Sequence, residues 1–146
     1  MKIEATSKSD HPTLIKIWEA SVRATHDFLQ EEDIVNLKPL ILEQYFDSVD
    51  LMCAKDEDGK IIGFCGVLDG NIEMLFISPE SRGSGVGTLL TQYAIENLGA
   101  MKVDVNEQNR QALGFYEHLG FIVVGRSPLD GQGKPYPLLH MELDKI

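Results

Sequence analysis

The chain has 146 residues, of which 43% are hydrophobic and 25% charged, a composition typical of one globular domain that we expect to span residues 1–146. Its formal net charge of -10 argues against a nucleic-acid partner, because nucleic-acid binding depends on neutralising phosphates. The sequence contains no apolar run long enough to cross a membrane and no secretory signal within residues 1–10, so we expect a cytoplasmic protein without a membrane partner.

The N-terminal third predicts an edge strand followed by two helices. Residues 2–6 alternate weakly between apolar and polar side chains, and Asp10 shortly before a proline is typical of a helix N-cap. Apolar residues then recur at helical spacing, which predicts an amphipathic helix over residues 11–26. A second helical pattern covers residues 32–46, and Pro39 inside it should break or restart that helix.

The middle of the chain predicts three consecutive antiparallel strands. An Asp-Gly pair at 58–59 between apolar runs is a strong hairpin signal, and a second turn follows at 69–71. The only two cysteines, Cys53 and Cys65, lie in these apolar runs, so we expect reduced core thiols rather than a disulfide. The three strands are expected at residues 51–54, 61–68 and 72–77.

Helical and strand patterns alternate in the last third of the chain. A helix that crosses the sheet joins the strand at 72–77 to the strand at 101–105, so these two strands should pair in parallel. The sequence therefore predicts a mixed α/β sheet. The remaining elements are expected to be a helix that starts near Asn109 and that Gly120 ends, a strand at 121–124, a loop at 127–135 and a strand at 138–143.

The stretch Arg-Gly-Ser-Gly-Val-Gly-Thr at residues 82–88 lies between a predicted strand and a predicted helix. A helix N-terminus leaves N–H groups free and favours negative charge, and glycines let the backbone approach phosphate oxygens. Gly87 is not followed by the lysine that a P-loop requires, which argues against a nucleotide-binding domain. Only Val86 separates Gly85 from Gly87, whereas the dinucleotide fingerprint has two residues there. The stretch therefore predicts a site for another kind of diphosphate.

The spacing Arg-x-x-Gly-x-Gly over residues 82–87 resembles the coenzyme A signature of the GCN5-related N-acetyltransferase (GNAT) superfamily. Residues 106–121 resemble the second hallmark of that family, with Asn, Asn, Ala, Phe-Tyr and Gly-Phe in the same order. The resemblance is strongest to the YjaB-like bacterial acetyltransferases and covers nearly the whole chain. It implies the GNAT fold, a mostly antiparallel sheet with helices on both faces and a splayed parallel strand pair that forms the coenzyme A cleft.

The resemblance also implies an acetyl-CoA-dependent N-acetyltransferase that transfers the acetyl group directly to a primary amine and needs no metal. The acceptor would be a small molecule or a protein amino group, and a homodimer is compatible with the family. The negative charge would suit a cationic acceptor, or it could serve solubility alone. A coenzyme A-binding sensor without turnover is the alternative function.

By the same resemblance, the cofactor site would surround the glycine-rich stretch. Backbone N–H groups of this stretch would hold the pyrophosphate, and amides near Ile77 would polarise the acetyl carbonyl and pair with the pantetheine arm. A bulge in the preceding strand would separate it from its parallel neighbour. Asn109 would contact the cofactor, a role compatible with a helix N-cap. The expected cofactor-binding residues are Phe76, Ile77, Arg82, Gly83, Ser84, Gly85, Val86, Gly87, Thr88, Asn109 and Phe115.

Acetyl transfer to an amine requires one proton acceptor and one proton donor. An alkyl ammonium with a pKa of about 10.4 must lose a proton, and the leaving thiolate must gain one. Tyr116 falls where the family places its general acid, although it could serve packing alone. Glu73 and His26 are candidates for the base; the alternatives are a solvated carboxylate and a histidine that caps a helix end.

The acceptor should be selected by residues 24–36 and 127–136, where the family places its substrate contacts. The candidate substrate residues there are Thr25, His26, Asp27 and Tyr136. His140, in the last predicted strand, could also reach the acceptor. These side chains define no particular amine.

Overall fold

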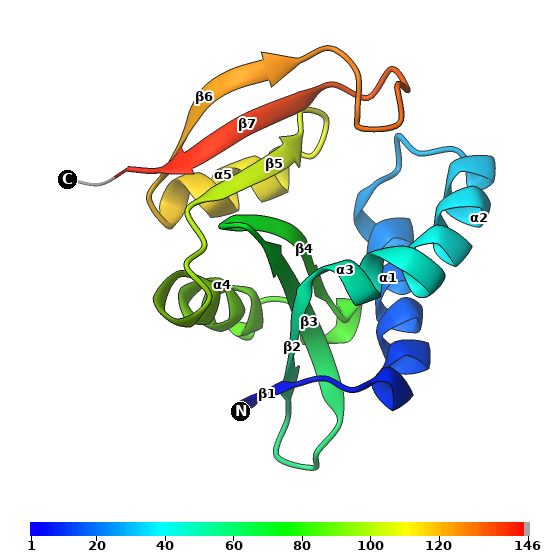
Figure 1. Ribbon diagram of the computed structural model, residues 1–146, viewed down its shortest axis with the longest axis vertical. Coiled ribbons are helices and arrows are strands. Elements are labelled where there is room, and N and C mark those ends of the chain that lie inside the picture. The colour runs from blue at the N-terminus through cyan, green and yellow to red at the C-terminus, as the bar shows by residue number, and fades with distance from the viewer. Residues whose placement is uncertain (145–146) are drawn as a thin grey trace.

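The computed structural model describes residues 1–144 and contains a seven-stranded sheet in the order β1-β2-β3-β4-β5-β7-β6 (Figure 1). Only β4 and β5 run parallel among the neighbouring pairs of the described residues, and the others are antiparallel. The predicted mixed sheet with one parallel pair is confirmed. The strands are β1 (Lys2–Ala5), β2 (Asp50–Lys55), β3 (Ile61–Leu68), β4 (Asn71–Ile77), β5 (Lys102–Asn106), β6 (Phe121–Ser127) and β7 (Leu138–Leu143).

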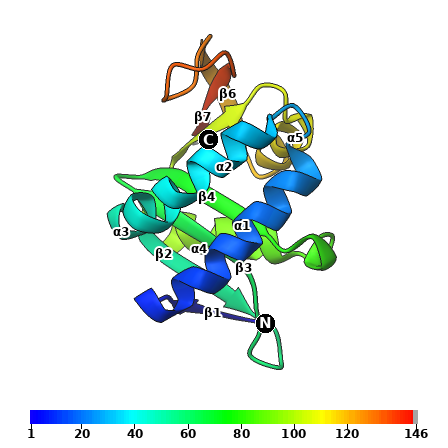
Figure 2. The ribbon, with the colours of Figure 1, turned by 90° about the vertical axis from the view of Figure 1, so that its right-hand side faces the viewer.

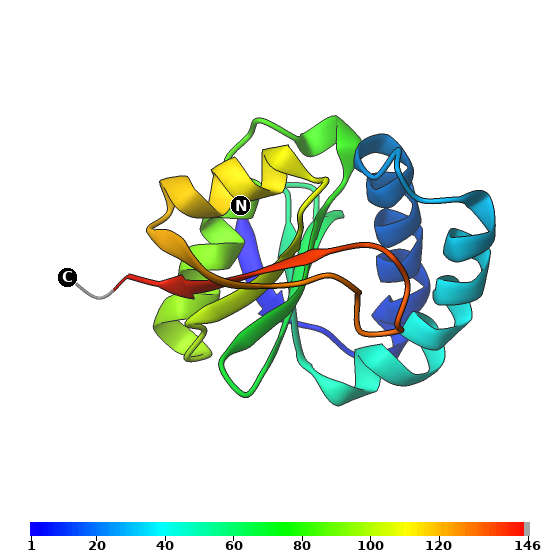
Figure 3. The same ribbon diagram turned by 90° about the horizontal axis from the view of Figure 1, so that it is seen from above.

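Helices cover both faces of the sheet. Figure 3 shows α1 and α2 on one side of the strands and α4 and α5 on the other. Within residues 1–144, no helix has the length and apolar character needed to cross a membrane. The α-helices are α1 (His11–Thr25), α2 (Glu31–Leu40), α3 (Phe46–Ser48), α4 (Val86–Asn97) and α5 (Arg110–His118), and the short turns are η1 (Lys8–Asp10), η2 (Ile41–Tyr45) and η3 (Pro79–Ser81).

Each face of the sheet has its own apolar core. Figure 2 shows α1 crossing the central strands. Its apolar side chains, among them Leu14 and Trp18, are buried in one cluster with Phe64 of β3. On the other face, α4 and α5 pack onto the sheet around Leu90 and Phe121. Because an amphipathic helix is stabilised mainly by burial of its apolar stripe, these two cores fix the ends of α1 and α5 in space.

Two local predictions about the first helices need correction. Asp10 occupies the N-cap position of α1 as predicted, but its carboxylate does not cap that helix. It accepts a hydrogen bond from the backbone N–H of Ser7, 2.9 Å away, and closes η1 instead. Pro39 does not break the second helix, because α2 runs through it and continues as the π-helical turn η2. A wider turn is a known way for a helix to absorb a local disturbance.

The β4 strand contains a bulge that shapes the rest of the molecule. Its register with β3 skips Glu73, which is therefore the extra residue. Bulges bend a strand and re-aim its side chains. Among the described residues, the β4–β5 ladder consists of two residue pairs and ends at Ile72 and Val103, beyond which the strands separate. The expected bulge and the splayed parallel pair are confirmed.

Candidate active site

A cavity of about 370 Å³ opens where β4 and β5 separate. The end of α1 lines it from one face of the sheet, and the starts of α4 and α5 line it from the other. The cavity brings together most of the predicted site residues: Thr25, His26, Phe76, Ile77, Arg82, Gly83, Gly85, Val86, Gly87, Thr88, Asn109, Phe115 and Tyr116.

The glycine-rich stretch forms the mouth of this cavity. Gly85 is the N-cap of α4 and has a left-handed backbone with φ of 86°. A Cβ atom at Gly87 would lie 3.3 Å from the Phe115 ring, so a side chain here would crowd the ring that lines this wall of the cavity. No side chain caps α4 within the described residues, which leaves its first N–H groups available to an anion.

Arg82 and Ser84 hold the same loop in place. The Arg82 guanidinium donates a hydrogen bond to Ser21 Oγ, 3.0 Å away, and so ties the mouth of the cavity to α1. Ser84 is not among the residues that line the cavity; its hydroxyl donates to the carbonyl of Ser81 within the loop. Arg82 thus offers a positive charge at the mouth, whereas Ser84 stabilises the turn.

Tyr116 lies at the inner end of the cavity and is only 6% exposed. Its ring packs edge-on against Phe115 and Phe121, with ring centroids 5.1 and 5.5 Å away. Burial raises the pKa of the phenol well above its usual range. Tyr116 therefore keeps its proton at neutral pH, which suits a general acid.

His26 faces the cavity from the C-terminal end of α1, and its hydrogen bonds indicate which ring nitrogen is protonated. The Thr25 hydroxyl donates to the carbonyl of Ser21, 2.8 Å away, and can therefore only accept from His26 Nδ1, also 2.8 Å away. That assignment leaves the lone pair on Nε2, which lies 3.4 Å from Asn109 Nδ2. The Asn109 amide is itself oriented, because its Oδ1 accepts from the Ala112 N–H at 3.1 Å.

The electrostatic surroundings keep His26 neutral. Burial lowers the pKa of its imidazole, the nearby Arg82 charge lowers the pKa further, and Asp27 acts in the opposite direction. A neutral imidazole with a free Nε2 is able to accept a proton.

Besides Ser84, three predicted site residues are not among those that line the cavity: Glu73, Asp27 and Tyr136. Glu73 is exposed as a whole residue. Partial desolvation of its carboxyl raises the pKa, Asn71 lowers it and the charge of Asp104 raises it, so that the pKa lies above its ordinary value. The Tyr136 hydroxyl donates to Asp33. Asp27 is exposed next to His26.

His140 takes part in a separate polar chain across the last strands. Its Nδ1 lies 2.6 Å from an Asp104 oxygen, and its Nε2 lies 2.7 Å from Ser127 Oγ. His140 is also outside the residues that line the cavity. Within residues 1–144, no group of three or more acidic, His or Cys side chains is arranged to hold a metal ion.

Sequence reasoning missed several residues of the cavity wall. Ser21 lies one helical turn before Thr25 on α1, so helical periodicity could have identified it. Ala112 follows Asn109 by three residues, in the first turn of α5. The missed residues are Ser21, Leu75, Ser81, Gln111 and Ala112.

Known proteins resemble this chain in sequence and in fold. Residues 29–144 match the family described as Acetyltransferase (GNAT) domain. Peptidyl-lysine N-acetyltransferase YjaB of Escherichia coli (strain K12) is 39% identical over 141 residues, which cover 97% of this chain and 95% of that protein. The solution structure of apo-form YjaB from Escherichia coli superposes with a TM-score of 0.88 at 38% identity, covering 99% of this chain and 98% of that one.

A more distant structure shares the fold. PaiA N-acetyltransferase from Thermoplasma acidophilum, solved in complex with coenzyme A, has a TM-score of 0.74 at 21% identity, covering 98% of each chain. The relatives are named as acetyltransferases, and none of these comparisons supports a sensor without turnover. The chain belongs to the GNAT family of N-acetyltransferases, enzymes that transfer an acetyl group to an amine.

Proposed function

We propose that this enzyme acetylates lysine side chains of proteins or peptides with acetyl-CoA as the donor. The observation that carries the proposal is one cavity, where β4 and β5 separate, that the glycine loop, Tyr116 and His26 all line. The names of the YjaB relatives support a peptidyl-lysine acceptor. Free, buried Cys53 and Cys65 suit a reducing compartment, which supports a bacterial cytoplasmic enzyme.

The residues at the mouth fit a diphosphate. The N-terminal N–H groups of α4 and the positive charge of Arg82 would bind its oxygens, and Gly87 leaves room beside Phe115. Acetyl-CoA would supply the thioester whose acetyl group is transferred. Backbone groups of Phe76 and Ile77, in the part of β4 beyond its ladder with β5, would bind the pantetheine arm and polarise the thioester carbonyl.

His26 and Tyr116 would each carry out one of the two proton transfers. His26 Nε2 would accept a proton from the lysine ammonium, and the neutral amine then attacks the carbonyl carbon. A C–N bond forms, the nitrogen releases its second proton to solvent, and the C–S bond breaks. Tyr116 would donate its phenolic proton to the departing sulfur and regain a proton from solvent. Both steps use the protonation states that burial favours, a neutral imidazole and a neutral phenol.

A cationic acceptor also matches the charge of the enzyme. The net charge of -10 raises the local concentration of ammonium groups near the surface. Asp27, next to His26, adds negative charge beside the cavity, and Glu73 and Asp104 add two more carboxylates that interact with each other. These carboxylates would attract a lysine without binding it inside the cavity.

The test follows thiol release from acetyl-CoA with three acceptors: a lysine peptide, the same peptide with lysine replaced by norleucine, and a polyamine. We expect turnover with the lysine peptide and none with the norleucine peptide. Turnover with the polyamine alone would contradict the peptidyl-lysine acceptor and favour a small-molecule amine. Thermal unfolding provides the binding control, because a ligand at 100 times its Kd stabilises by about 2.7 kcal/mol; acetyl-CoA and coenzyme A should do so, and ATP and NAD should not.

A further inference from the structure

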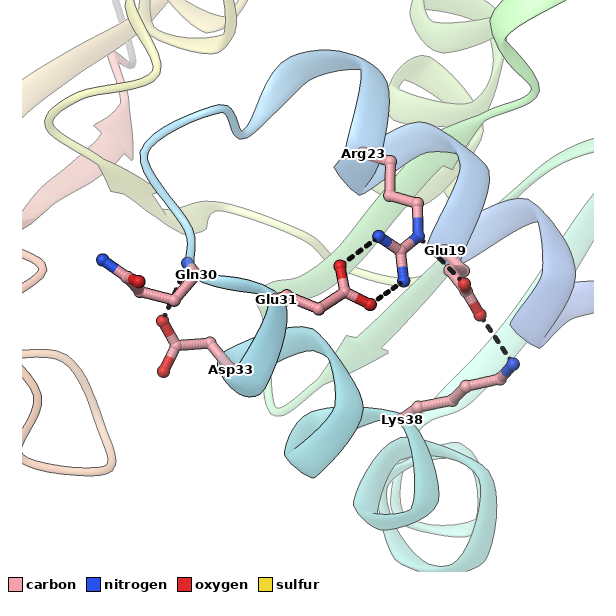
Figure 4. Close-up of polar contacts among 6 residues, drawn as sticks. All are labelled: Glu19, Arg23, Gln30, Glu31, Asp33 and Lys38. Carbon is pink, nitrogen blue, oxygen red and sulfur yellow. Dashed lines mark hydrogen bonds and ion pairs between the residues drawn. The ribbon is translucent and has the colours of Figure 1, made fainter.

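One buried carboxylate ties the start of α2 to the loop between β6 and β7 (residues 128–137). Asp33 is 7% exposed and accepts hydrogen bonds from Lys134 Nζ, 2.6 Å away, and from the Tyr136 hydroxyl. It also accepts from the backbone N–H of Gln30 at 3.1 Å, as Figure 4 shows. Its partners in the β6–β7 loop are more than 100 residues away in sequence, so this cluster is a tertiary link and not a local cap alone.

The link continues through aromatic contacts to the cavity. The Tyr136 ring lies 6.0 Å from the Phe28 ring, and the Phe28 ring lies 5.3 Å from the imidazole of His26. Both separations are within the range of favourable aromatic contacts. A continuous path of side chains therefore runs from Asp33 through Tyr136 of the β6–β7 loop and Phe28 to the base candidate.

We propose that Asp33 is a positioning residue for acetyl transfer: by binding Lys134 and Tyr136 it holds the α1–α2 loop (residues 26–30), and with it His26, in the orientation that the reaction requires. The inference rests on the proposed function. Asp33 is not among the residues that line the cavity, so it acts through its neighbours and not on the acceptor directly.

The positioning role has a physical basis, because the hydrogen bonds of Asp33 restrain a loop of only a few residues that carries His26. Residues 26–30 connect two helices, and the backbone bond from the Leu29 N–H to the His26 carbonyl holds the loop locally. Without Asp33, the Tyr136 ring would lose its anchor and Phe28 would lose a neighbour. A shift of about 1 Å in a reacting group can lower a rate by about 100-fold, so a small displacement of His26 would be measurable.

The first experiment compares Asp33→Asn with a matched control on the same helix. Glu31 is also paired with a cation, since Arg23 donates to its two oxygens at 2.5 and 2.8 Å, but that pair lies outside the path to His26 (Figure 4). With the lysine peptide, we expect Asp33→Asn to lower kcat about tenfold or more while the Kd for acetyl-CoA stays the same. Glu31→Gln should keep the wild-type kcat.

A second variant removes the partner in the β6–β7 loop. Lys134→Met should lower kcat in the same direction as Asp33→Asn, and the double variant should be no worse than the poorer single variant, because both changes break one link. If Asp33→Asn fails to fold, Lys134→Met alone decides the question. NMR of the His26 imidazole gives a readout that is independent of turnover: its ring signals should move in Asp33→Asn and Lys134→Met and stay in place in Glu31→Gln.

The outcomes separate this inference from the proposed function. A wild-type enzyme that fails to acetylate the peptide contradicts the proposed function, and the His26 signals then decide whether Asp33 holds the loop. An active wild type with equally active Asp33→Asn and Lys134→Met variants overturns the positioning role alone. An equal loss of activity in Glu31→Gln would also overturn it, since the effect would then come from general weakening of α2.

Discussion

His26 Nε2 and Asn109 Nδ2 lie 3.4 Å apart and join the end of α1 to the start of α5 across 83 residues of sequence. The contact spans the cavity between the helices of the two faces of the sheet. Because the Asn109 amide is the donor in this pair, an incoming ammonium can replace it as the donor to Nε2. The acceptor and the base candidate would then meet where the two sides of the site join.

Replacing His26 with glutamine should remove the proton acceptor and keep a polar side chain. We expect kcat to fall about 100-fold or more, with an unchanged Kd for acetyl-CoA. The wild-type profile of kcat/KM against pH should fall on the acid side below about pH 6.5, since burial and Arg82 lower the pKa of His26 from its ordinary value. The His26→Gln variant should lose this acid limb.

The matched control for that variant is His118→Gln, because His118 is exposed on α5 and does not line the cavity. It should retain the wild-type rate and pH profile. An unaltered acid limb in His26→Gln would assign the base to another group.

Tyr116→Phe should separate catalysis from packing. The phenylalanine ring keeps the contacts with Phe115 and Phe121, so the free energy of unfolding should change little, whereas kcat should fall about 100-fold because the sulfur loses its proton donor. Tyr93→Phe on α4, away from the cavity, serves as the control. Wild-type turnover in Tyr116→Phe would reduce Tyr116 to a packing residue.

Glu73→Gln distinguishes the two base candidates. Since Glu73 is exposed and is not among the residues that line the cavity, we expect this variant to keep nearly the whole wild-type kcat. Any loss should appear in KM for a cationic acceptor, because one attracting charge is removed. A fall in kcat as large as that of His26→Gln would assign the proton transfer to Glu73, acting through water.

Gly85→Ala should weaken both the fold and the donor site. Alanine in the left-handed region costs about 1 kcal/mol, and the strain falls on the residue that starts α4. We expect a lower melting temperature and a raised Kd for coenzyme A in calorimetric titration. Gly114→Ala in α5 is the control: its backbone is helical and a Cβ there meets no atom within 4 Å, so the protein should become more stable.

Asp33 should make stability depend on pH in the acid range. Hydrogen bonds from Lys134 and then Tyr136 lower the pKa of Asp33 to about 2, below its value in the unfolded chain. The stabilisation is therefore complete above about pH 4 and is lost as the pH falls toward 2. Urea unfolding should show Asp33→Asn less stable than the wild type at pH 7, with a difference that shrinks toward pH 2. A difference independent of pH would contradict this account.

The order of elements and the glycine loop could be predicted because their signals are local. An apolar strand, Pro79, spaced glycines and a helical stripe from Val86 identify the loop without reference to the rest of the chain. The capping rule located the N-cap of α1 at Asp10 but not the partner of its carboxylate, and the proline rule failed at Pro39. The Asp10 carboxylate closes a 3-10 turn instead of capping the helix, and Pro39 is followed by a π-helical turn.

The full set of residues that line the cavity could not be predicted, because it depends on contacts between residues far apart in sequence, which the spacing of apolar residues does not reveal. His26 and Tyr116 are 90 positions apart, and the two cores of the sheet bring them to one cavity. The bulge re-aims Glu73, and strict alternation along β4 cannot predict where its side chain points. The Tyr136 hydroxyl donates to Asp33, 103 residues away in sequence, and no local pattern predicts such a contact.

The separation of β4 from β5 also creates an open sheet edge inside the molecule. Exposed strand edges are usually blunted or covered, because their free N–H and C=O groups recruit other strands. Here the ends of α1 and α5 enclose the edge, and under the proposed function the extended arm of the donor would complete the ladder. Alternate amides of residues 75–77 already face β3, so only those that face the cavity should exchange more slowly when the donor is bound. The enzyme would then gain part of its sheet with every turnover and lose it again.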